Sequence, residues 1–396
     1  MSDREFDVVV YGATGFTGKL VAEYLAASAP PSLRWALAGR NGAKLAEVAS
    51  SVSRHGVAPP TLIASAESFT SLVSMATRTR VVLTTVGPYM KYGFPLVEAC
   101  VGAGTDAVDL TGEPAFVRGV MDRFHEPAKA AKARIVSCCG FDSIPHDLGV
   151  LHAIRTIRPH VPAATAIEVR GYLKATGGFS GGTWHSALGI FKDLGKGARP
   201  REGRDPSGRS VKKLDLGLHR EPRGKGWGLP MPTIDPWIVR RSARELEEYG
   251  PDFANGHFVC MPSLPAAVGM VAGAVAVIGL AQIEPTRKLL ERYKDPGDGP
   301  SAAHRAKARF SITFITEAAG YRCVTRVSGG DPGYDETAKM IAESAIALAR
   351  DRQTLPPRYG ALTPALAFGD RLLVRLPAVG IPFEVIEPPA KVSSAP

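Results

Sequence analysis

Residues 8–18 have the sequence Val-Val-Val-Tyr-Gly-Ala-Thr-Gly-Phe-Thr-Gly, and this stretch decides the fold. Its apolar start predicts a buried strand, and a helical pattern over 18–27 follows at once. Gly12 suits a tight turn, Gly15 lets the backbone approach a pyrophosphate, and Gly18 allows close packing of helix on strand. Its spacing is Gly-x-x-Gly-x-x-Gly rather than the standard Gly-x-Gly-x-x-Gly. The segment predicts a phosphate-binding turn, with a plain tight strand–helix turn as the alternative.

Short apolar runs alternate with helical patterns as far as residue 139. Strands are predicted at 6–11, 35–38, 61–64, 80–86, 106–110 and 134–138, and helices at 18–27, 44–52, 69–76, 95–103 and 124–133. This alternation is typical of a parallel sheet with helices on both faces. The sequence therefore predicts an α/β fold whose N-terminal domain, residues 1–149, is a Rossmann-type doubly wound parallel sheet.

The pattern changes in the second part of the chain. Residues 165–173 alternate as a half-buried strand would, and 309–316 and 322–327 resemble a pair of strands. Residues 150–330 therefore predict a second, α+β domain, with a long loop at 196–230, where glycine, proline and charge are dense. Residues 331–396 predict C-terminal helices at 335–350 and 364–376. Whether these helices pack back on the Rossmann domain stays open.

Residues 258–283 contain no charged side chain and are apolar over most of their length. A buried helix or hairpin wall is one interpretation. Peripheral membrane contact, or the lining of a channel for a fatty substrate, is the other, since about 20 apolar residues are needed to span a bilayer. Both interpretations stay open.

Composition narrows the class of protein. The 396 residues include five cysteines, an odd number without a Cys-x-x-Cys pair or Cys/His cluster, which argues against a disulfide framework or a metal site. The charged N-terminus is unlike a secretory signal, so we expect a cytoplasmic protein and leave membrane association open. The formal net charge is +10, and residues 192–225 hold 11 Lys/Arg against 5 Asp/Glu. That stretch predicts a solvated loop or a surface for an acidic partner or anionic membrane, but no nucleic-acid site, because aromatic residues are absent from it.

Two cations follow the second predicted strand. A site for NAD usually has Asp or Glu there, to bind the ribose 2′-hydroxyl. This chain has Arg40, and Lys44 follows one turn later. A guanidinium suits the 2′-phosphate of NADP(H), which a carboxylate would repel. The alternative for Arg40 is an ordinary surface cation at a helix start.

The fourth predicted strand runs into Val86-Gly87-Pro88, at the sheet edge where open α/β folds bind ligands. We expect this loop to lie near the nicotinamide half of the cofactor. The candidate cofactor-binding residues are Gly12, Thr14, Gly15, Phe16, Thr17, Gly18, Arg40, Asn41, Lys44, Val86, Gly87 and Pro88.

An ordered series of motifs resembles one family over almost the whole chain. It comprises YGATGFTG (11–18), AGR (38–40), VGPY (86–89), YG (92–93), LTGEP (110–114), CGFDSIP (139–145), GGT (181–183), IVRR (238–241), GDPGY (330–334) and LTP (362–364). The series looks like the saccharopine dehydrogenase-like oxidoreductases, and most resembles the actinobacterial trans-acting enoyl reductases. The resemblance implies a Rossmann domain, NADPH, and a lipidic or polyketide acyl substrate, free or bound to a carrier protein.

Enoyl reduction needs hydride transfer, hydrogen-bond donors for the developing enolate, and a proton. The candidate catalytic residues are Tyr89 and Tyr92, next to the nicotinamide-side loop, and Asp142, in the turn after the sixth strand. Lys174 and His185 are weaker candidates, and each of these side chains could be structural instead. Two other functions stay open: a saccharopine-type reductase of an amino-acid-derived imine, and a non-catalytic NADPH-binding protein associated with lipid or membrane.

Overall fold

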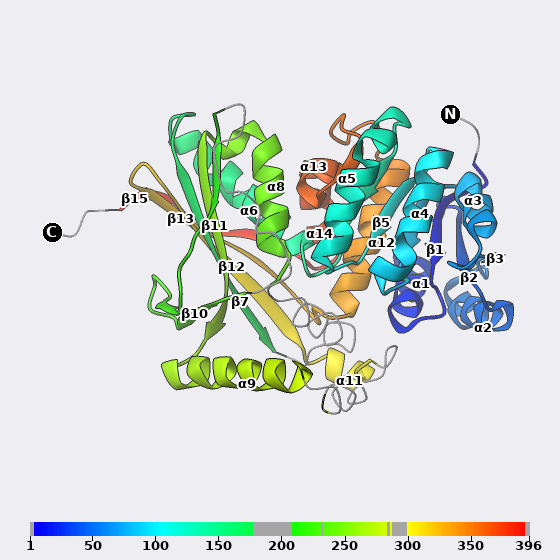
Figure 1. Ribbon diagram of the computed structural model, residues 1–396, viewed down its shortest axis with the longest axis horizontal. Coiled ribbons are helices and arrows are strands. Elements are labelled where there is room, and N and C mark those ends of the chain that lie inside the picture. The colour runs from blue at the N-terminus through cyan, green and yellow to red at the C-terminus, as the bar shows by residue number, and fades with distance from the viewer. Residues whose placement is uncertain (1–3, 177–207, 232, 283–285, 287–298, 393–396) are drawn as a thin grey trace. The chain divides into compact units, whose positions relative to one another are not determined.

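The computed structural model describes residues 4–176, 208–231, 233–282, 286 and 299–392. The chain forms two compact units (Figure 1). Unit 1 comprises Met1–Ile144 and Tyr334–Gly380, and unit 2 comprises Pro145–Gly333 and Ile381–Pro396. The glycine-rich loop at 177–183 and His185 lie outside the described residues.

Unit 1 is built on a seven-stranded sheet in the order β14-β6-β5-β4-β1-β2-β3. The strands are β1 (Phe6–Tyr11), β2 (Trp35–Gly39), β3 (Thr61–Ile63), β4 (Thr79–Thr84), β5 (Asp106–Asp109), β6 (Arg134–Val136) and β14 (Gly360–Leu362). Every pair of neighbours is parallel. All of β1 is buried, as the unbroken apolar run predicts. The predicted Rossmann-type sheet is confirmed.

The helices of unit 1 follow these strands. They are α1 (Phe16–Ser28), α2 (Gly42–Val52), α3 (Phe69–Arg78), α4 (Tyr89–Ala103), α5 (Pro114–Ala130), α12 (Asp335–Arg350), α13 (Pro364–Phe368) and α14 (Asp370–Ala378), with the 3₁₀ turn η1 (Ser53–His55). Helices α1, α2, α4 and α5 begin earlier than predicted. The difference is largest for α4, which begins at Tyr89, and for α5, which begins at Pro114, where proline suits the first helical turn. The single helix predicted at 364–376 is wrong, because Gly369, with φ +50°, separates α13 from α14.

The C-terminal part of the chain completes unit 1. Strand β14 pairs with β6, and α12 contacts α1, β1, β4 and β5. The side chain of Arg352 pairs with the buried carboxylate of Asp106. The segment 335–378 therefore belongs to the same compact unit as the N-terminal residues. Its strand joins their sheet, and its helix α12 packs on that sheet.

Unit 2 is built on a mixed sheet in the order β15-β13-β12-β7-β11-β10-β9, with β8 beside β11. The strands are β7 (Ile167–Thr176), β8 (Ser210–Lys213), β9 (His219–Arg220), β10 (Trp227–Pro230), β11 (Asp252–Met261), β12 (Arg309–Ala318), β13 (Tyr321–Gly329) and β15 (Phe383–Lys391). The helices are α6 (Ile144–Ile157), α8 (Asp235–Glu245), α9 (Leu264–Gln282) and α11 (Ala302–Arg305), with 3₁₀ turns η2 (Arg158–His160) and η3 (Glu247–Tyr249). This second, mixed unit confirms the predicted fold class.

Three features of unit 2 differ from the sequence predictions. The predicted loop at 196–230 is wrong over its described part, because β8, β9 and β10 form there by pairing in the sheet of β11. The end of the predicted C-terminal helical segment forms strand β15, which pairs with β13. The segment 258–283 divides into the end of β11 and helix α9, whose aliphatic side chains are largely exposed rather than buried. Among the described residues, no helix is both long and apolar enough to cross a membrane.

Candidate functional site

The turn after β1 is held by the next strands of the sheet. Gly12 has φ +93°, and its N–H donates to the carbonyl of Ala38 at 2.9 Å. A Cβ atom on Gly12 would lie 2.7 Å from Oγ1 of Thr85, and one on Gly18 would lie 2.2 Å from the Gly12 carbonyl oxygen. Packing within the protein therefore requires glycine at both positions.

Gly15 is different, since a Cβ atom there would meet only the Gly12 carbonyl oxygen, at 3.4 Å. Gly15 is exposed and precedes α1, which has no acidic residue in its first turn. The first N–H groups of a helix have no partner within the helix, and the helix dipole favours an anion there. The missing side chain thus leaves the backbone open to a pyrophosphate, which fits a dinucleotide.

The side chains around this turn have distinct surroundings. Thr14 and Thr17 are half-buried. The ring of Phe16 packs edge-to-face on Tyr334, with 4.7 Å between ring centroids. Tyr334 comes from the C-terminal part of the chain, a neighbour that local sequence patterns do not indicate.

The predicted cations lie where β2 meets α2. Arg40 and Lys44 are exposed, and neither side chain forms an ion pair within the described part of the chain. Asn41 caps α2, since its Oδ1 accepts from the backbone N–H of Lys44 at 3.0 Å. The amide of Asn41 therefore orders the helix start that carries the two free cations.

The loop after β4 reaches the glycine turn. A Cβ atom on Gly12 would lie 2.8 Å from Cγ2 of Val86, so these two predicted residues are brought together. Gly87 and Pro88 are exposed. Glu113 holds the end of this loop: its two carboxylate oxygens accept from the N–H groups of Tyr89 (2.8 Å) and Met90 (2.9 Å). This role was not predicted, and only the position of Glu113 in the LTGEP motif could have indicated it.

The two candidate tyrosines differ in burial. Tyr89 is buried against Phe116, and its hydroxyl donates to the Thr84 carbonyl at 3.3 Å and accepts from the N–H of Leu110 at 3.2 Å. Burial raises the pKa of Tyr89 well above its usual value. Tyr92 is half-buried in the first turn of α4, with the Lys91 ammonium 4.8 Å from its ring centroid.

Two carboxyl groups lie at one edge of the sheet: Asp109 is the last residue of β5, and Asp142 follows β6. Asp142 is exposed in the turn after β6, and a Cβ atom on Gly112 would lie 2.9 Å from its Oδ2. The glycine thus leaves room for this carboxylate. Asp109 is buried, and it accepts from the N–H of Cys138 at 3.0 Å and from Oγ of Ser137 at 2.8 Å. Burial raises the pKa of Asp109 to about 6. Sequence reasoning placed Asp109 in a strand and missed this role.

Unit 2 holds the remaining candidates. Lys174 is exposed near the end of β7.

Among the described residues, His146, Asp235 and His257 form the one group that could hold a metal ion, and all three are buried. The carboxylate of Asp235 accepts a hydrogen bond from Nδ1 of His257 and lies 3.4 Å from Nδ1 of His146. Burial lowers the pKa of His146 to about 4, so this side chain is neutral at pH 7. The group ties α6, α8 and β11 together.

The relatives of this chain carry a common name. A Mycobacterium tuberculosis protein, named provisionally as a trans-acting enoyl reductase, is 40% identical over 413 residues, covering 96% of this chain and 97% of the relative. Trans-acting enoyl reductases of Mycobacterium bovis and Mycobacterium leprae are 36% identical over 410 and 407 residues, again covering 96% and 97%. The chain belongs to the trans-acting enoyl reductase family. This membership confirms the resemblance inferred from the motifs.

The fold of this trans-acting enoyl reductase family member has a solved counterpart. Apo saccharopine dehydrogenase (L-Glu forming) from Saccharomyces cerevisiae matches with a TM-score of 0.54 and 14% identity, over 96% of this chain and 100% of that chain. At this identity the likeness shows the fold alone. No model of a known protein family matches the chain. The relatives are named enoyl reductases, and an enoyl reductase is an oxidoreductase. The chain therefore belongs to a family of oxidoreductases.

Proposed function

We propose that this protein is an NADP(H)-dependent enoyl reductase that saturates a C=C bond of a lipidic or polyketide acyl substrate in trans. The name shared by its relatives supports the reaction. The observation that carries the cofactor assignment is the exposed guanidinium of Arg40, without an ion-pair partner in the described residues, at the carboxyl end of β2. A carrier protein that presents the acyl chain belongs to the same proposal.

The N–H of Gly15 donates to the Gly12 carbonyl at 3.0 Å and closes the turn, so the pyrophosphate binds to the backbone N–H groups in the first turn of α1, beside the open face of Gly15. Arg40 and Lys44 bind the 2′-phosphate, where both charge and guanidinium geometry favour an anion. The loop Val86–Pro88 borders the nicotinamide half. When bound, NADPH supplies the hydride.

The reduction is balanced by one hydride and one proton. In such a reduction a hydride adds to the carbon β to the carbonyl, the C=C electron pair forms a new double bond to the carbonyl carbon, and the carbonyl π pair moves to oxygen. The carbonyl then re-forms as the α-carbon takes up a proton. Tyr92 donates a hydrogen bond to the developing enolate oxygen, and Asp142 holds the water that delivers the proton. Tyr89 has its hydroxyl engaged at both Thr84 and Leu110, so we assign it the positioning of the loop rather than proton transfer.

The cofactor assignment is tested by Arg40→Asp. The carboxylate repels the 2′-phosphate and accepts from the 2′-hydroxyl, so KM for NADPH rises about a hundredfold relative to KM for NADH. Rates of cofactor oxidation with a 2-enoyl thioester measure this change. Arg54→Asp, beyond the opposite end of α2, is the control and leaves the ratio unchanged.

An unchanged NADPH preference in Arg40→Asp would contradict the cofactor assignment. Tight NADPH binding without turnover on the enoyl thioester would contradict the reaction. Turnover with an amino acid and keto acid pair instead would favour the saccharopine-type alternative.

A further inference from the structure

Helix α9 exposes aliphatic side chains over most of its length. Its large exposed residues are Leu264, Val268, Met270, Val271, Val275 and Leu280. Ala267 is the one buried side chain among the described residues of this helix. The helix contacts β10 and β11, yet among the described residues no atom outside the helix's own nearby backbone lies within 4 Å of a Cβ atom built on Gly269, Gly273 or Gly279. A helix that is apolar on all sides normally lies in a protein core or in lipid.

The distribution of the exposed side chains around α9 distinguishes between a protein partner and lipid as the surface that covers this helix. Leu264, Val268, Val271 and Val275 follow the spacing i, i+4, i+7, i+11 and form one stripe, whereas Met270 points away from it. A second helix or rigid protein surface covers one stripe. Lipid chains surround a helix, so exposure on several sides favours lipid.

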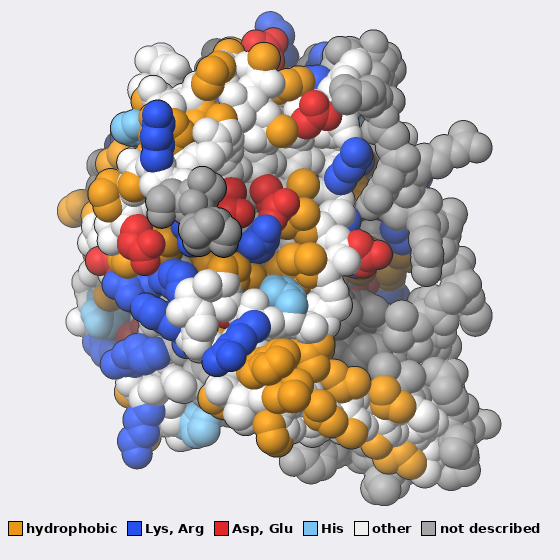
Figure 2. All heavy atoms as spheres, turned by 90° about the vertical axis from the view of Figure 1, so that its left-hand side faces the viewer, with side chains coloured by type: hydrophobic (Ala, Val, Ile, Leu, Met, Phe, Trp, Pro, Cys, Tyr) orange, Lys and Arg blue, Asp and Glu red, His pale blue; other side chains and the backbone are white. Residues whose placement is uncertain are grey.

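Cations lie beside the start of this helix. A Cβ atom on Gly226 would lie 2.5 Å from the Met261 carbonyl oxygen, so the 220–226 loop packs against the end of β11. Lys174, Arg220 and Lys225 are exposed, and none of them forms an ion pair within the described residues. Figure 2 shows Lys and Arg side chains next to a band of hydrophobic ones on this face.

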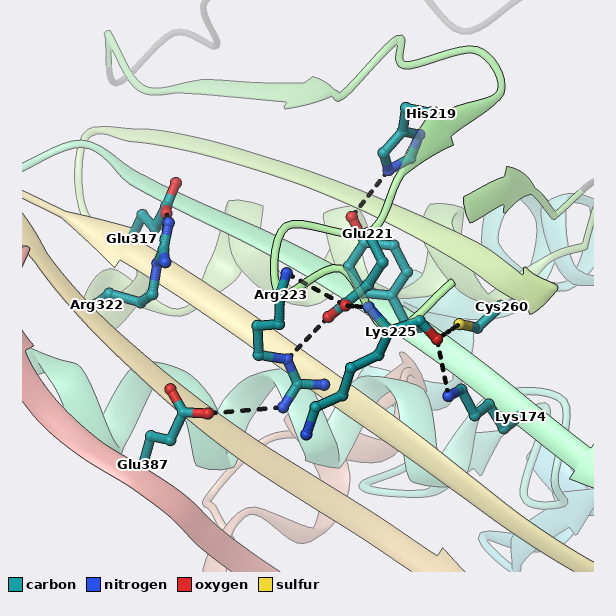
Figure 3. Close-up of polar contacts among 10 residues, drawn as sticks. Lys174, His219, Glu221, Arg223, Lys225, Cys260, Glu317, Arg322 and Glu387 are labelled. Atoms are coloured by element: carbon teal, nitrogen blue, oxygen red, sulfur yellow. Dashed lines mark hydrogen bonds and ion pairs between the residues drawn. The ribbon is translucent and has the colours of Figure 1, made fainter. Parts of the chain in front are cut away.

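The loop that carries these cations is fixed in place. Nζ of Lys174 donates to the Lys225 carbonyl at 3.2 Å, which joins the loop to β7 (Figure 3). Arg223 is instead engaged by the buried carboxylate of Glu221 at 2.8 Å, and by Glu387 at 3.7 Å. Three cations, Lys174, Arg220 and Lys225, therefore have no carboxylate partner among the described residues, whereas Arg223 is paired with two.

We propose that helix α9 and the adjacent cations Lys174, Arg220 and Lys225 dock this protein on an anionic lipid surface. The aliphatic side chains enter the acyl region, and the ammonium and guanidinium groups bind anionic headgroups. This proposal goes beyond the reductase function and does not depend on it.

Co-flotation of the full chain with vesicles tests the proposal. Wild-type protein binds phosphatidylcholine vesicles that contain phosphatidylglycerol about a hundredfold more tightly than pure phosphatidylcholine vesicles, since three cations each favour the anionic surface. V268Q/V271Q/V275Q loses about a hundredfold of this affinity. The control is Val374→Gln on α14, whose exposure of 64% matches the 63% of Val275, and it binds like wild type.

A second variant tests the charges without touching the helix. K174Q/K225Q loses about twentyfold in affinity for the anionic vesicles, whereas K129Q/K132Q, two exposed lysines of unit 1, does not. Three results would each overturn the proposal: no vesicle binding by the wild type, equal binding to both vesicle types, or unchanged binding by the valine variant. A wild-type dimer in light scattering that V268Q/V271Q/V275Q abolishes would also overturn it, because a second copy would then cover α9.

Discussion

At the residue scale, Asp109 is a buried carboxyl group at the end of β5. Its oxygens accept from the N–H groups of Thr111 and Cys138, each at 3.0 Å, and from Oγ of Ser137. Cys138 has φ +64°, a left-handed conformation that is uncommon outside glycine. The carboxyl group thus holds the turn after β6, which leads to Asp142. Burial nevertheless outweighs these bonds and raises the pKa of Asp109 to about 6.

The raised pKa predicts a pH-dependent stability. Because the folded state favours the protonated form, the stabilisation from this group is complete below the ordinary value of 3.8 and is lost as pH rises through about 6. The wild type therefore loses about 3 kcal/mol relative to Asp109→Asn over that interval. Urea unfolding of both proteins across the interval measures the difference. A difference that does not change with pH would show that Asp109 titrates normally.

The residues that could be predicted are those whose role is set by neighbours in sequence. Gly12 and Gly18 follow from the strand–turn–helix pattern, and the structure gives both a packing reason. Glu113 and Asp109 act on backbone groups from other elements, so their roles depend on the sheet order. The hydroxyl of Tyr89 was assigned from its loop alone, and only the positions of Thr84 and Leu110 show that it is engaged.

At the element scale, the join between β1 and α1 separates two kinds of glycine. A Cβ atom on Gly18 would lie 2.2 Å from a backbone oxygen, whereas one on Gly15 would lie at an ordinary 3.4 Å. Gly18 is therefore required for packing inside the protein. Gly15 instead leaves the backbone at the helix start open to a ligand. Their substitutions therefore separate stability from cofactor binding.

We expect Gly18→Ala to lose about 3 kcal/mol of unfolding free energy, because backbone must shift to relieve the overlap. Gly15→Ala changes stability by less than about 1 kcal/mol, as expected for a helix N-cap position, yet weakens NADPH binding at least about tenfold. Chemical denaturation and NADPH fluorescence titration measure the two effects. Equal loss of stability in both variants would contradict this division of roles.

Elements with strong local patterns were predicted, and those made by pairing were not. Strands β1 and β4 and the hairpin of β12 and β13 follow from their apolar patterns. The short β8 and β9 form beside longer strands, and their sequence alone resembles loop. For α9, composition predicts an apolar segment but not what covers it, so the sequence left burial and lipid contact both open, and the structure shows exposure.

At the scale of the whole molecule, the chain leaves unit 1 at Ile144 and returns to it at Tyr334. The returning segment adds β14 to the sheet, places Arg352 on Asp106 and packs Tyr334 on Phe16. The N-terminal segment that carries the candidate cofactor residues is thus packed against the C-terminal segment of unit 1. Unit 2 carries the α9 surface, so the proposed redox site and the proposed lipid contact belong to separate compact units.

The central claim is that this chain transfers hydride from NADPH to an enoyl group, and isotope transfer tests it most directly. The protein is incubated with a 2-enoyl thioester and, in separate reactions, with NADPH deuterated at either C4 position. Mass spectrometry of the saturated product then locates the label. We predict one deuterium at the β-carbon from one of the two cofactors, and none from the other. A saturated product without deuterium from either cofactor, or no saturated product while NADPH is bound, would contradict the account.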